Sequence, residues 1–455
     1  MERALFVIMA GGEGKRLHRL AGSLPKPLLR FGPSARFIDF TLYNCLASGA
    51  KEVVVLTPAG KPGEMIEHYL DRQWQPAFAS HGARLSTVSG AQTPAHKFRG
   101  TAHAVHQALR RHPGSPEHVV VLAADHVYRM DYRSMLRFHR GHGAAATVAT
   151  VELEWTQARG LGLVSAEANG RVSGFLEKPE HLDHWILQDR KPLSSMGIYV
   201  FNRRALLQYF EDEPEVLEFG HDLLPRLSRD RELYAYRFLG PDGHPGYWRG
   251  LGTPFSFWQA HMEILNGQGR HFFAEAPLPG VQPPLVSAHR VRKMVAGEQW
   301  IYNSLISPTA IIGNALIEDS VIGPDVVIED GASIEKSVIL DGAVIRQWTE
   351  LDCALVGPGL EIKQALNATQ EIELGLEFRA PRRMPVQPAE ESLPLLSAPI
   401  PAQPRLAMPK RPRTPGALVA RGAFEAREPL EARLLSGARV PSPENPLSAS
   451  SHSKP

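Results

Sequence analysis

The sequence predicts a doubly wound α/β domain with a mixed sheet, then a short left-handed parallel β-helix, then a disordered tail. Three observations carry this prediction: apolar runs that alternate with helical patterns, a hydrophobic repeat every six residues, and a late change in composition. With 455 residues, the chain is long enough for two or three domains. We expect the α/β domain at 1–262, a connector at 263–300, the β-helix at 301–360 and the tail at 379–455.

Unbroken apolar runs in the first part of the chain have the length of strands that are buried on both faces. Such strands are typical of a parallel or mixed sheet that helices cover. The expected strands are Ala4–Ala10, Glu52–Thr57, Val119–Ala124, Ala145–Val151 and Ile198–Phe201. Helix-like stretches lie between them, including Phe40–Ser48 and Ala102–Arg111. This alternation indicates a doubly wound fold.

Further along, aliphatic residues recur with a period of six. One column contains Ala310, Leu316, Ile322, Ile328, Ile334 and Leu340, and a second contains Asn314, Ser320, Val326, Ala332, Val338 and Val344. Neither a helix nor a hairpin has this period, whereas each six-residue side of a triangular β-helix coil points one aliphatic residue inward. So short a stack needs its ends covered. We therefore expect it to pack on the α/β domain or on a second subunit.

Composition excludes several classes of function. A formal net charge of +2 is too balanced to favour a nucleic acid partner. The two cysteines, Cys45 and Cys353, lie far apart in sequence and indicate a reducing compartment without disulfides. The apolar run near the N-terminus is too short for a membrane span, so we expect a cytoplasmic protein without a targeting segment.

From about Arg379, prolines recur and large aromatic residues become rare, which is typical of a chain that cannot bury a core.

A glycine-rich turn, GGEGKRL at 11–17, directly follows the first expected strand. Its backbone N–H groups can form an anion-binding nest, and Arg16 adds a forked charge for a triphosphate. The proline-flanked Lys26 is a natural second cation near this loop. Asp125 follows the strand run VVVLAA, at the edge where open α/β sheets bind ligands. The alternative for the glycine-rich turn is a tight strand–helix connection. For Lys26 it is a solvated lysine at a helix start, and for Asp125 it is a helix cap.

These segments and several later ones resemble the family of glucose-1-phosphate adenylyltransferases, also called ADP-glucose pyrophosphorylases. The similarity spans about residues 4–360 and includes a hexapeptide domain in the expected place. Its segments are GGEGKRL, PKPLL, RFIDFTLYNCLASG, FRGTAHAV, VVVLAADHVYRMDY, GFLEKP, SSMGIYVF, EFGHDLLP and GYWRGLGTPFSFWQAH.

The resemblance implies a nucleotidyltransferase that joins an NTP, expected to be ATP, to a sugar 1-phosphate, expected to be glucose 1-phosphate. The products would be an NDP-sugar for glucan synthesis and pyrophosphate, with Mg²⁺ as cofactor. It also implies these roles: Arg16, Lys26 and Asp125 in catalysis, with Asp125 holding the metal; Gly11, Gly12, Gly14, Gly100 and Thr101 at the nucleotide; Glu177, Lys178, Ser195, Gly197 and Asp222 at the sugar phosphate. For the residues of the expected sugar pocket, ordinary turn or cap chemistry is the alternative.

Five departures from the family's pattern fall on working positions. Gly250 stands where the family has a second metal-binding aspartate, and His103 and His221 replace an aspartate and a lysine. Pro58 and the segment 23–25 also differ. Two interpretations therefore remain: an active nucleotidyltransferase, or a weak or inactive homologue that regulates a true enzyme subunit. We expect a homo-oligomer, or a hetero-oligomer with such a subunit, and no membrane partner.

Overall fold

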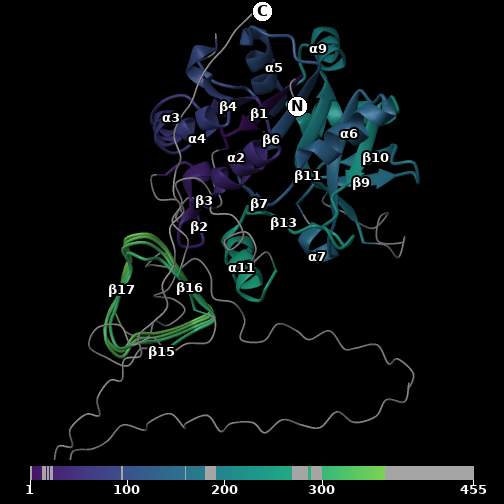
Figure 1. The fold of residues 1–455 in the computed structure, drawn as a ribbon. Helices are drawn as coiled ribbons and strands as arrows, with labels where there is room; N and C mark the ends of the chain where they lie inside the picture. Colours follow the sequence, from purple (N-terminus) through teal and green to yellow (C-terminus); the bar gives the residue numbers. More distant parts are fainter. Residues whose placement is uncertain are drawn as a thin grey trace, which may run out of the picture. The chain divides into compact units, whose positions relative to one another are not determined.

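The structure is a computed structural model whose described part is discontinuous. It describes residues 3–12, 17, 20, 24–93, 96–158, 160–179, 191–268, 285–287 (backbone only) and 300–363. The predicted tail at 379–455 and most of the connector at 263–300 lie outside these residues. The order of the elements is an α/β domain followed by a parallel β-helix, which confirms the predicted fold class (Figure 1).

A mixed sheet forms the centre of the first domain. Nine of the described strands belong to it, in the order β10-β9-β11-β6-β1-β4-β5, with β8 on β11 and β12 on β8. β11 runs antiparallel to β6 and β8, whereas β1 is parallel to β4 and β6. The strands are β1 (Ala4–Met9), β4 (Glu52–Thr57), β5 (Arg84–Ser89), β6 (His118–Ala123), β8 (Ala146–Glu152), β9 (Leu163–Ala166), β10 (Val172–Leu176), β11 (Leu193–Asn202) and β12 (Leu233–Arg237).

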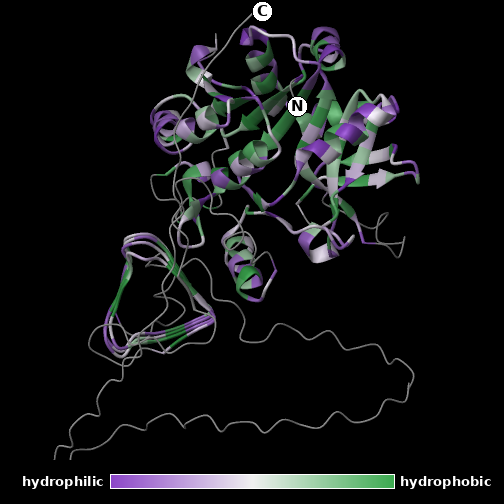
Figure 2. Ribbon diagram, in the orientation of Figure 1, coloured by the Kyte–Doolittle hydropathy of each residue, from purple (hydrophilic) through white to green (hydrophobic). Residues whose placement is uncertain are grey.

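Helices cover both faces of this sheet, as a doubly wound fold requires. Alternate residues of β1 point to opposite faces, so Phe6 and Ile8 enter one core cluster and Leu5 and Val7 the other. The central strands are the most hydrophobic part of the domain (Figure 2). The first cluster includes residues of α2 (Phe37–Ala47), α3 (Lys61–Gln73), α4 (Gln75–Ser80) and α6 (Tyr132–His142); the second includes residues of α5 (Thr101–Arg111), α9 (Arg203–Asp212) and α10 (Leu224–Arg229).

Shorter elements shape the loops around the sheet. Two small antiparallel pairs, β2 with β3 and β7 with β13, lie outside it, and α11 precedes the connector. These elements are η2 (Lys26–Leu28), β2 (Arg30–Phe31), β3 (Ala35–Arg36), η3 (Gly90–Gln92), β7 (His126–Tyr128), α7 (Trp155–Ala158), η4 (Phe219–Leu223), β13 (Trp248–Gly250), α11 (Pro254–Leu265) and β14 (Leu285–Ser287).

The C-terminal described segment is the β-helix, whose three parallel sheets form the sides of a triangle (Figure 1). β14 adds to the second sheet in antiparallel orientation. The first sheet contains β15 (Trp300–Tyr302), β18 (Leu316–Glu318), β21 (Ser333–Glu335) and β24 (Glu350–Asp352); the second β16 (Ser304–Ile306), β19 (Val321–Ile322), β22 (Val338–Ile339) and β25 (Leu355–Val356); the third β17 (Ile311–Ile312), β20 (Val327–Ile328), β23 (Val344–Ile345) and β26 (Glu361–Ile362).

The six-residue register predicted for the β-helix is only partly right. Trp300 pairs with Leu316 and Leu316 with Ser333, so each coil is shorter than three six-residue sides. The cause is a corner made by a single residue with positive φ, which recurs at Asn303, Asp319, Lys336 and Cys353. Leu316 was therefore wrongly predicted to point inward: it is 46% exposed, and its neighbour Ile317 fills the core instead.

The β-helix packs on the α/β domain, which is one of the two arrangements predicted from the sequence. Phe257 and Ile264 of α11 share a core cluster with Leu305, Val321 and Val338 of the β-helix. At the same contact, the Trp258 indole donates a hydrogen bond to the Lys336 carbonyl over 2.8 Å. An ion pair between Arg30 and Asp341 adds a polar contact between the two domains. The second sheet of the β-helix is thus covered by the α/β domain.

Candidate active site

The candidate site lies at the carboxyl edge of the parallel strands, where Asp125 follows β6. The register pairs Met9 of β1 with Ala123 of β6, so the loops after these two strands meet at one edge. Gly11 and Gly12, after β1, are exposed, and a Cβ at either position would meet no atom of the described residues within 4 Å. With respect to these residues, the backbone at Gly11 and Gly12 is open to a ligand. Arg16 and Gly14 lie outside the described residues.

Lys26 and Asp125 form the strongest polar contact of the site. The ammonium Nζ of Lys26 lies 2.6 Å from Oδ2 of Asp125, and the lysine side chain is only 11% exposed. Lys26 begins η2 between two prolines, and Pro25 has a φ of −66°, so the backbone there is rigid. Burial by itself would raise the pKa of Asp125, but His126 and Lys26 outweigh it and lower the pKa to about 2.

His126 stands on the other side of the carboxylate. Its Nε2 lies 3.5 Å from Oδ1 of Asp125, and its ring packs edge-on against Trp248. Burial lowers the pKa of His126 against the opposing effect of Asp125, so the ring is neutral at pH 7. Nδ1 is buried, and no described residue hydrogen-bonds to it. His126 was not predicted as a site residue.

Two glycines make room for the His126 ring. Gly197 has a φ of +67°, and a Cβ there would lie 3.1 Å from Cε1 of the ring. It sits where the pairing of β11 with β8 shifts register, as at the β-bulges that often adjoin active sites. Gly250 is the direct strand partner of His126 in the β7–β13 pair, and its Cβ would lie 3.6 Å from Nε2. Position 250 and the Asp125 carboxylate therefore both lie beside Nε2 of His126.

Glu177 is a second acidic residue of the site, and residues of β11 connect it to Asp125. Its carboxylate accepts a 2.7 Å hydrogen bond from the Lys178 ammonium, and Lys178 is 55% exposed with a φ of 45°. Gly162 and Gly220 leave space for Glu177, because a Cβ at either would lie 3.0 Å or less from Oε2. The Gly162 carbonyl also accepts a hydrogen bond from the Ser195 amide, and the Ser195 hydroxyl accepts one from the Gly197 amide.

Gly100 and Thr101 begin α5, and a loop from the other half of the domain occupies this helix end. Glu218 accepts hydrogen bonds from both the amide and the hydroxyl of Thr101, the latter over 2.6 Å. A Cβ at Gly100 would lie 2.4 Å from the Leu217 carbonyl oxygen. Asp222 accepts the amides of Leu217 and Glu218, so its carboxylate holds the loop in place.

The described site residues thus form one row of contacts across the sheet edge. The row runs from Lys26 through Asp125, His126, Gly197, Ser195, Gly162 and Glu177 to Gly220. From Gly220 it continues through the η4 turn to Asp222 and Glu218 and so to Thr101. The structure therefore brings together residues that the sequence scatters over nearly two hundred positions.

The other departures from the family's pattern make none of the contacts of this row. Nδ1 of His103 accepts the Arg99 amide, which ties the start of α5 to the preceding loop. His221 is exposed, and Pro58 directly follows β4, whose end pairs with that of β1. Ser23 lies outside the described residues.

A divalent cation fits the Asp125 position only with help from a substrate. Among the described residues, no group of three or more histidines, cysteines or acids lies close enough to hold a metal. One carboxylate with open backbone nearby is nevertheless a usual protein contribution to Mg²⁺, because substrate phosphates and water supply the remaining oxygens. The donor set is thus compatible with a metal that is shared with a polyphosphate.

The comparison with known families agrees with the fold and with the strand-end site. The sequence matches the nucleotidyl transferase family over residues 5–267 and the family described as GlmU-like, C-terminal hexapeptide over residues 286–374. The first match covers more than half of the chain. The chain therefore belongs to the nucleotidyl transferase family and is an enzyme of this class.

Individual relatives narrow the class. The chain is 36% identical to glucose-1-phosphate adenylyltransferase 2 of Vibrio parahaemolyticus over 279 residues, which cover 58% of this chain and 68% of that protein. It is 37% identical to glucose-1-phosphate adenylyltransferase of Clostridium acetobutylicum over 269 residues, 57% of this chain and 67% of that protein.

No helix among the described residues is long and apolar enough to span a membrane.

Proposed function

We propose that this enzyme transfers the adenylyl group of ATP to glucose 1-phosphate, giving ADP-glucose and pyrophosphate. The observation that carries the proposal is the Asp125 carboxylate at the end of β6, held ionised by Lys26 beside the open glycine loop. The names of the two relatives support this choice of ATP and glucose 1-phosphate. The product would serve glucan synthesis.

In the proposed reaction a phosphate oxygen of the sugar phosphate attacks the α-phosphorus of ATP. The bond from that phosphorus to the oxygen of the β-phosphate breaks, and pyrophosphate leaves with the bonding electrons. Lys26 donates to the phosphate oxygens on which charge gathers, and Lys178 holds the phosphate of the sugar. Arg16 assists at the triphosphate, and the backbone of Gly11, Gly12 and Gly14 supports the nucleotide.

The remaining residues position the substrates. Glu177, Ser195 and Gly197 form the side of the row that faces the sugar, and Asp222 fixes the loop that holds Gly100 and Thr101 beside the nucleotide. Asp125 would hold Mg²⁺, which would supply Lewis-acid neutralisation of phosphate charge. Gly250 adds no second carboxylate to Asp125, so substrate phosphates and water would complete the oxygen ligands.

A second candidate function follows from Gly250: a catalytically weak homologue that regulates a true enzyme subunit. Gly250 is the strand partner of His126, whose Nε2 lies beside Asp125, so an aspartate there would add a second carboxylate near the same ring nitrogen. The two candidates predict different results for Gly250→Asp. An active enzyme with a substrate-completed metal site should change its turnover by less than about tenfold. A rise of about a hundredfold or more would support the regulatory candidate.

The proposed function is tested by measuring pyrophosphate release from the purified full chain with Mg²⁺. Each common NTP is combined with a panel of sugar 1-phosphates, and each mixture is compared with the NTP alone. We expect release with ATP and glucose 1-phosphate that requires both substrates. If another base or sugar is preferred, the transfer stands but the assigned substrates are wrong. If no mixture releases pyrophosphate, the enzymatic proposal is rejected.

A further inference from the structure

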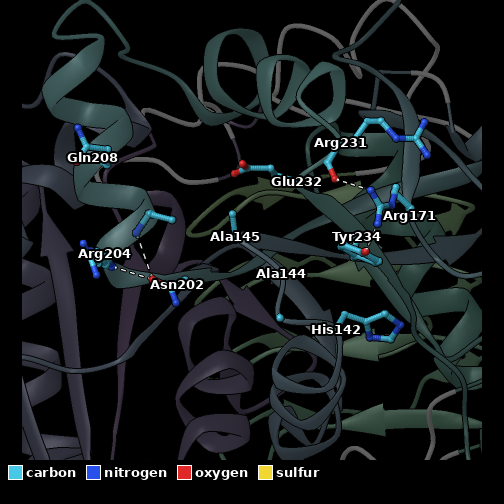
Figure 3. A pocket seen from close by; sticks show the side chains of 12 residues that line it. His142, Ala144, Ala145, Arg171, Asn202, Arg204, Gln208, Arg231, Glu232 and Tyr234 are labelled. Atoms are coloured by element: carbon cyan, nitrogen blue, oxygen red, sulfur yellow. Dashed lines mark hydrogen bonds between the residues drawn. The ribbon is translucent and has the colours of Figure 1, made fainter.

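A separate cavity lies at the opposite edge of the central sheet from Asp125. Asp125 follows the end of β6, whereas this cavity opens where β8 and β12 begin and where β11, which runs antiparallel, ends. It has a volume of about 650 Å³, within the usual range for small-molecule sites. Figure 3 shows its lining, which comes from the end of α6, the residue before β10, the start of α9 and the start of β12. None of the residues assigned above to nucleotidyl transfer lines it.

Arg171 provides the most constrained cation of this cavity. Its Nη2 donates to the Tyr234 hydroxyl over 2.8 Å, and Nη1 makes a longer contact of 3.4 Å with the Arg231 carbonyl. Its Nε is buried, and no described residue accepts a hydrogen bond from it. Nor does any described carboxylate form an ion pair with this guanidinium. The guanidinium of Arg171 thus has neutral hydrogen-bond partners but no counter-charge among the described residues.

Arg204 lies across the cavity from Arg171, in the first turn of α9 (Figure 3). Its side chain is exposed and has no ion pair with any described residue. Beside it, Oδ1 of Asn202 accepts the amides of Arg204 and Ala205, so the amide nitrogen of Asn202 is left as a further donor. Donors therefore stand on both sides of the cavity.

The acidic groups near the cavity do not balance these cations. Arg231 is paired with Glu167 over 3.0 Å, so its charge is already compensated. Glu232, the one acidic residue of the lining, accepts a hydrogen bond from the Tyr209 hydroxyl over 3.2 Å. Arg171 and Arg204 thus supply two positive charges against the single negative charge of Glu232.

We propose that this cavity binds a small organic anion through Arg171 and Arg204, with the Tyr234 hydroxyl and the Asn202 amide as neutral partners. The ligand carries at least two phosphate or carboxylate groups, because the two guanidinium groups lie on opposite sides and each suits a forked anion. One anionic group meets the guanidinium of Arg171, and the other meets Arg204 at the start of α9. The site is separate from the site of nucleotidyl transfer.

The test measures binding of sodium phosphate and of sodium succinate to the full chain by titration calorimetry and thermal shift. Sodium chloride keeps the ionic strength constant, and no nucleotide or metal is added, so the result does not depend on catalysis. The variants are Arg171→Gln and Arg204→Gln, with Arg72→Gln, an exposed arginine of α3, as the matched control. Because Arg204 is exposed, its variant should fold even if the Arg171 variant does not.

We expect Arg204→Gln to weaken binding of at least one of the two anions by about tenfold, while Arg72→Gln leaves it unchanged. An effect on phosphate alone assigns a phosphorylated ligand, and an effect on succinate alone assigns a polycarboxylate. Any phosphate bound at the active site remains in every variant, so only the difference from the unmodified chain counts. Equal affinity of the unmodified chain and Arg204→Gln for both anions would overturn the proposal, as would no binding of either anion.

Discussion

At the scale of single residues, the charge of Asp125 depends on two neighbours of different kinds. Lys26 is a rigidly placed cation that bonds one carboxylate oxygen, and His126 lies beside the other. Together they lower the pKa of Asp125 to about 2, so the carboxylate is ionised at neutral pH. A metal that arrives with a polyphosphate therefore meets a carboxylate that needs no deprotonation.

Asp125→Asn should lower turnover by about a hundredfold or more, because it removes the anion that is proposed to hold the metal. The measurement is the steady-state rate of pyrophosphate release from ATP and glucose 1-phosphate. Asp131→Asn is the control, since Asp131 lies at the start of α6 and bonds the exposed Arg133. Turnover of Asp125→Asn equal to that of the control would refute the role of Asp125.

His261 predicts a pH dependence of stability. The ring is buried, its Nδ1 donates to the Phe257 carbonyl, and its Nε2 accepts the Gly32 amide over 2.9 Å. Burial lowers its pKa to about 4, whereas the unfolded chain keeps a value near 6.5. Between these values the unfolded state binds more protons, so stability is full above pH 6.5 and falls as the pH drops towards 4.

The check is the free energy of unfolding across pH 4 to 7 in the unmodified chain and in His261→Gln. Glutamine offers both a donor and an acceptor but does not titrate. In the variant, the free energy of unfolding should therefore depend less steeply on pH in this window, by up to about 1.4 kcal/mol per pH unit. Identical slopes for the two proteins would show that His261 does not titrate as described. His244→Gln, at an exposed histidine, serves as the control.

At the scale of elements, the β-helix is held by a ladder of buried serines as well as by its aliphatic core. The hydroxyls of Ser304, Ser320 and Ser337 each accept the amide of the next coil, at Ser320, Ser337 and Ala354, over 3.0 Å. Each hydroxyl also donates to the carbonyl two residues before it. The ladder thus satisfies backbone groups at the tight single-residue corners.

Ser320→Ala should destabilise the protein by about 1–3 kcal/mol, because it leaves the buried Ser337 amide without its side-chain acceptor. The measurement is the free energy of unfolding from denaturant titration. Ser333→Ala on the neighbouring sheet is the matched control, since no described residue hydrogen-bonds to that hydroxyl, which faces away from the core. Equal stability of the two variants would contradict a structural role for the ladder.

Elements buried on both faces could be predicted from the sequence, and polar ones could not. The runs at Glu52–Thr57 and in β1 and β6 form strands where expected. The edge strand Arg84–Ser89 was not predicted, because an edge strand is partly solvated and its sequence is polar. In the β-helix the period of six predicted the fold but not the shorter coils, since one-residue corners leave no hydrophobic signal.

The candidate site shows the same division. Lys26 and Asp125 were each predicted as site residues, but the direct contact between them was not predicted. The neighbourhood of His126 and Gly250 could not be foreseen, because β7 and β13 pair across a long separation in sequence. Thr101 was predicted to lie beside the nucleotide. That Glu218 accepts a hydrogen bond from the Thr101 hydroxyl was not predicted.

At the scale of the whole molecule, the two described domains share one core through α11 and the second sheet of the β-helix. The first sheet instead carries exposed apolar side chains: Trp300 is 51% exposed and its strand partner Leu316 is 46% exposed. Such a patch is typical of an interface. We propose that the enzyme forms an oligomer in which the β-helix takes part.

Light scattering of the full chain should therefore give a mass that is a multiple of 50.2 kDa. Leu316→Glu should shift the mass towards that of a single chain, because it would place a charge in the proposed interface. Leu239→Glu, at another exposed leucine outside the β-helix, should leave the mass unchanged. A single-chain mass for the unmodified protein would contradict the proposal.

The most direct test of the central claim follows the α-phosphate of ATP. Purified full chain is mixed with ATP labelled at the α-phosphorus, glucose 1-phosphate and Mg²⁺, and the products are separated. We expect label in ADP-glucose, formed together with unlabelled pyrophosphate, and almost none with Asp125→Asn. Label that remains in ATP, or that appears in AMP or ADP without a sugar nucleotide, would contradict the proposed transfer.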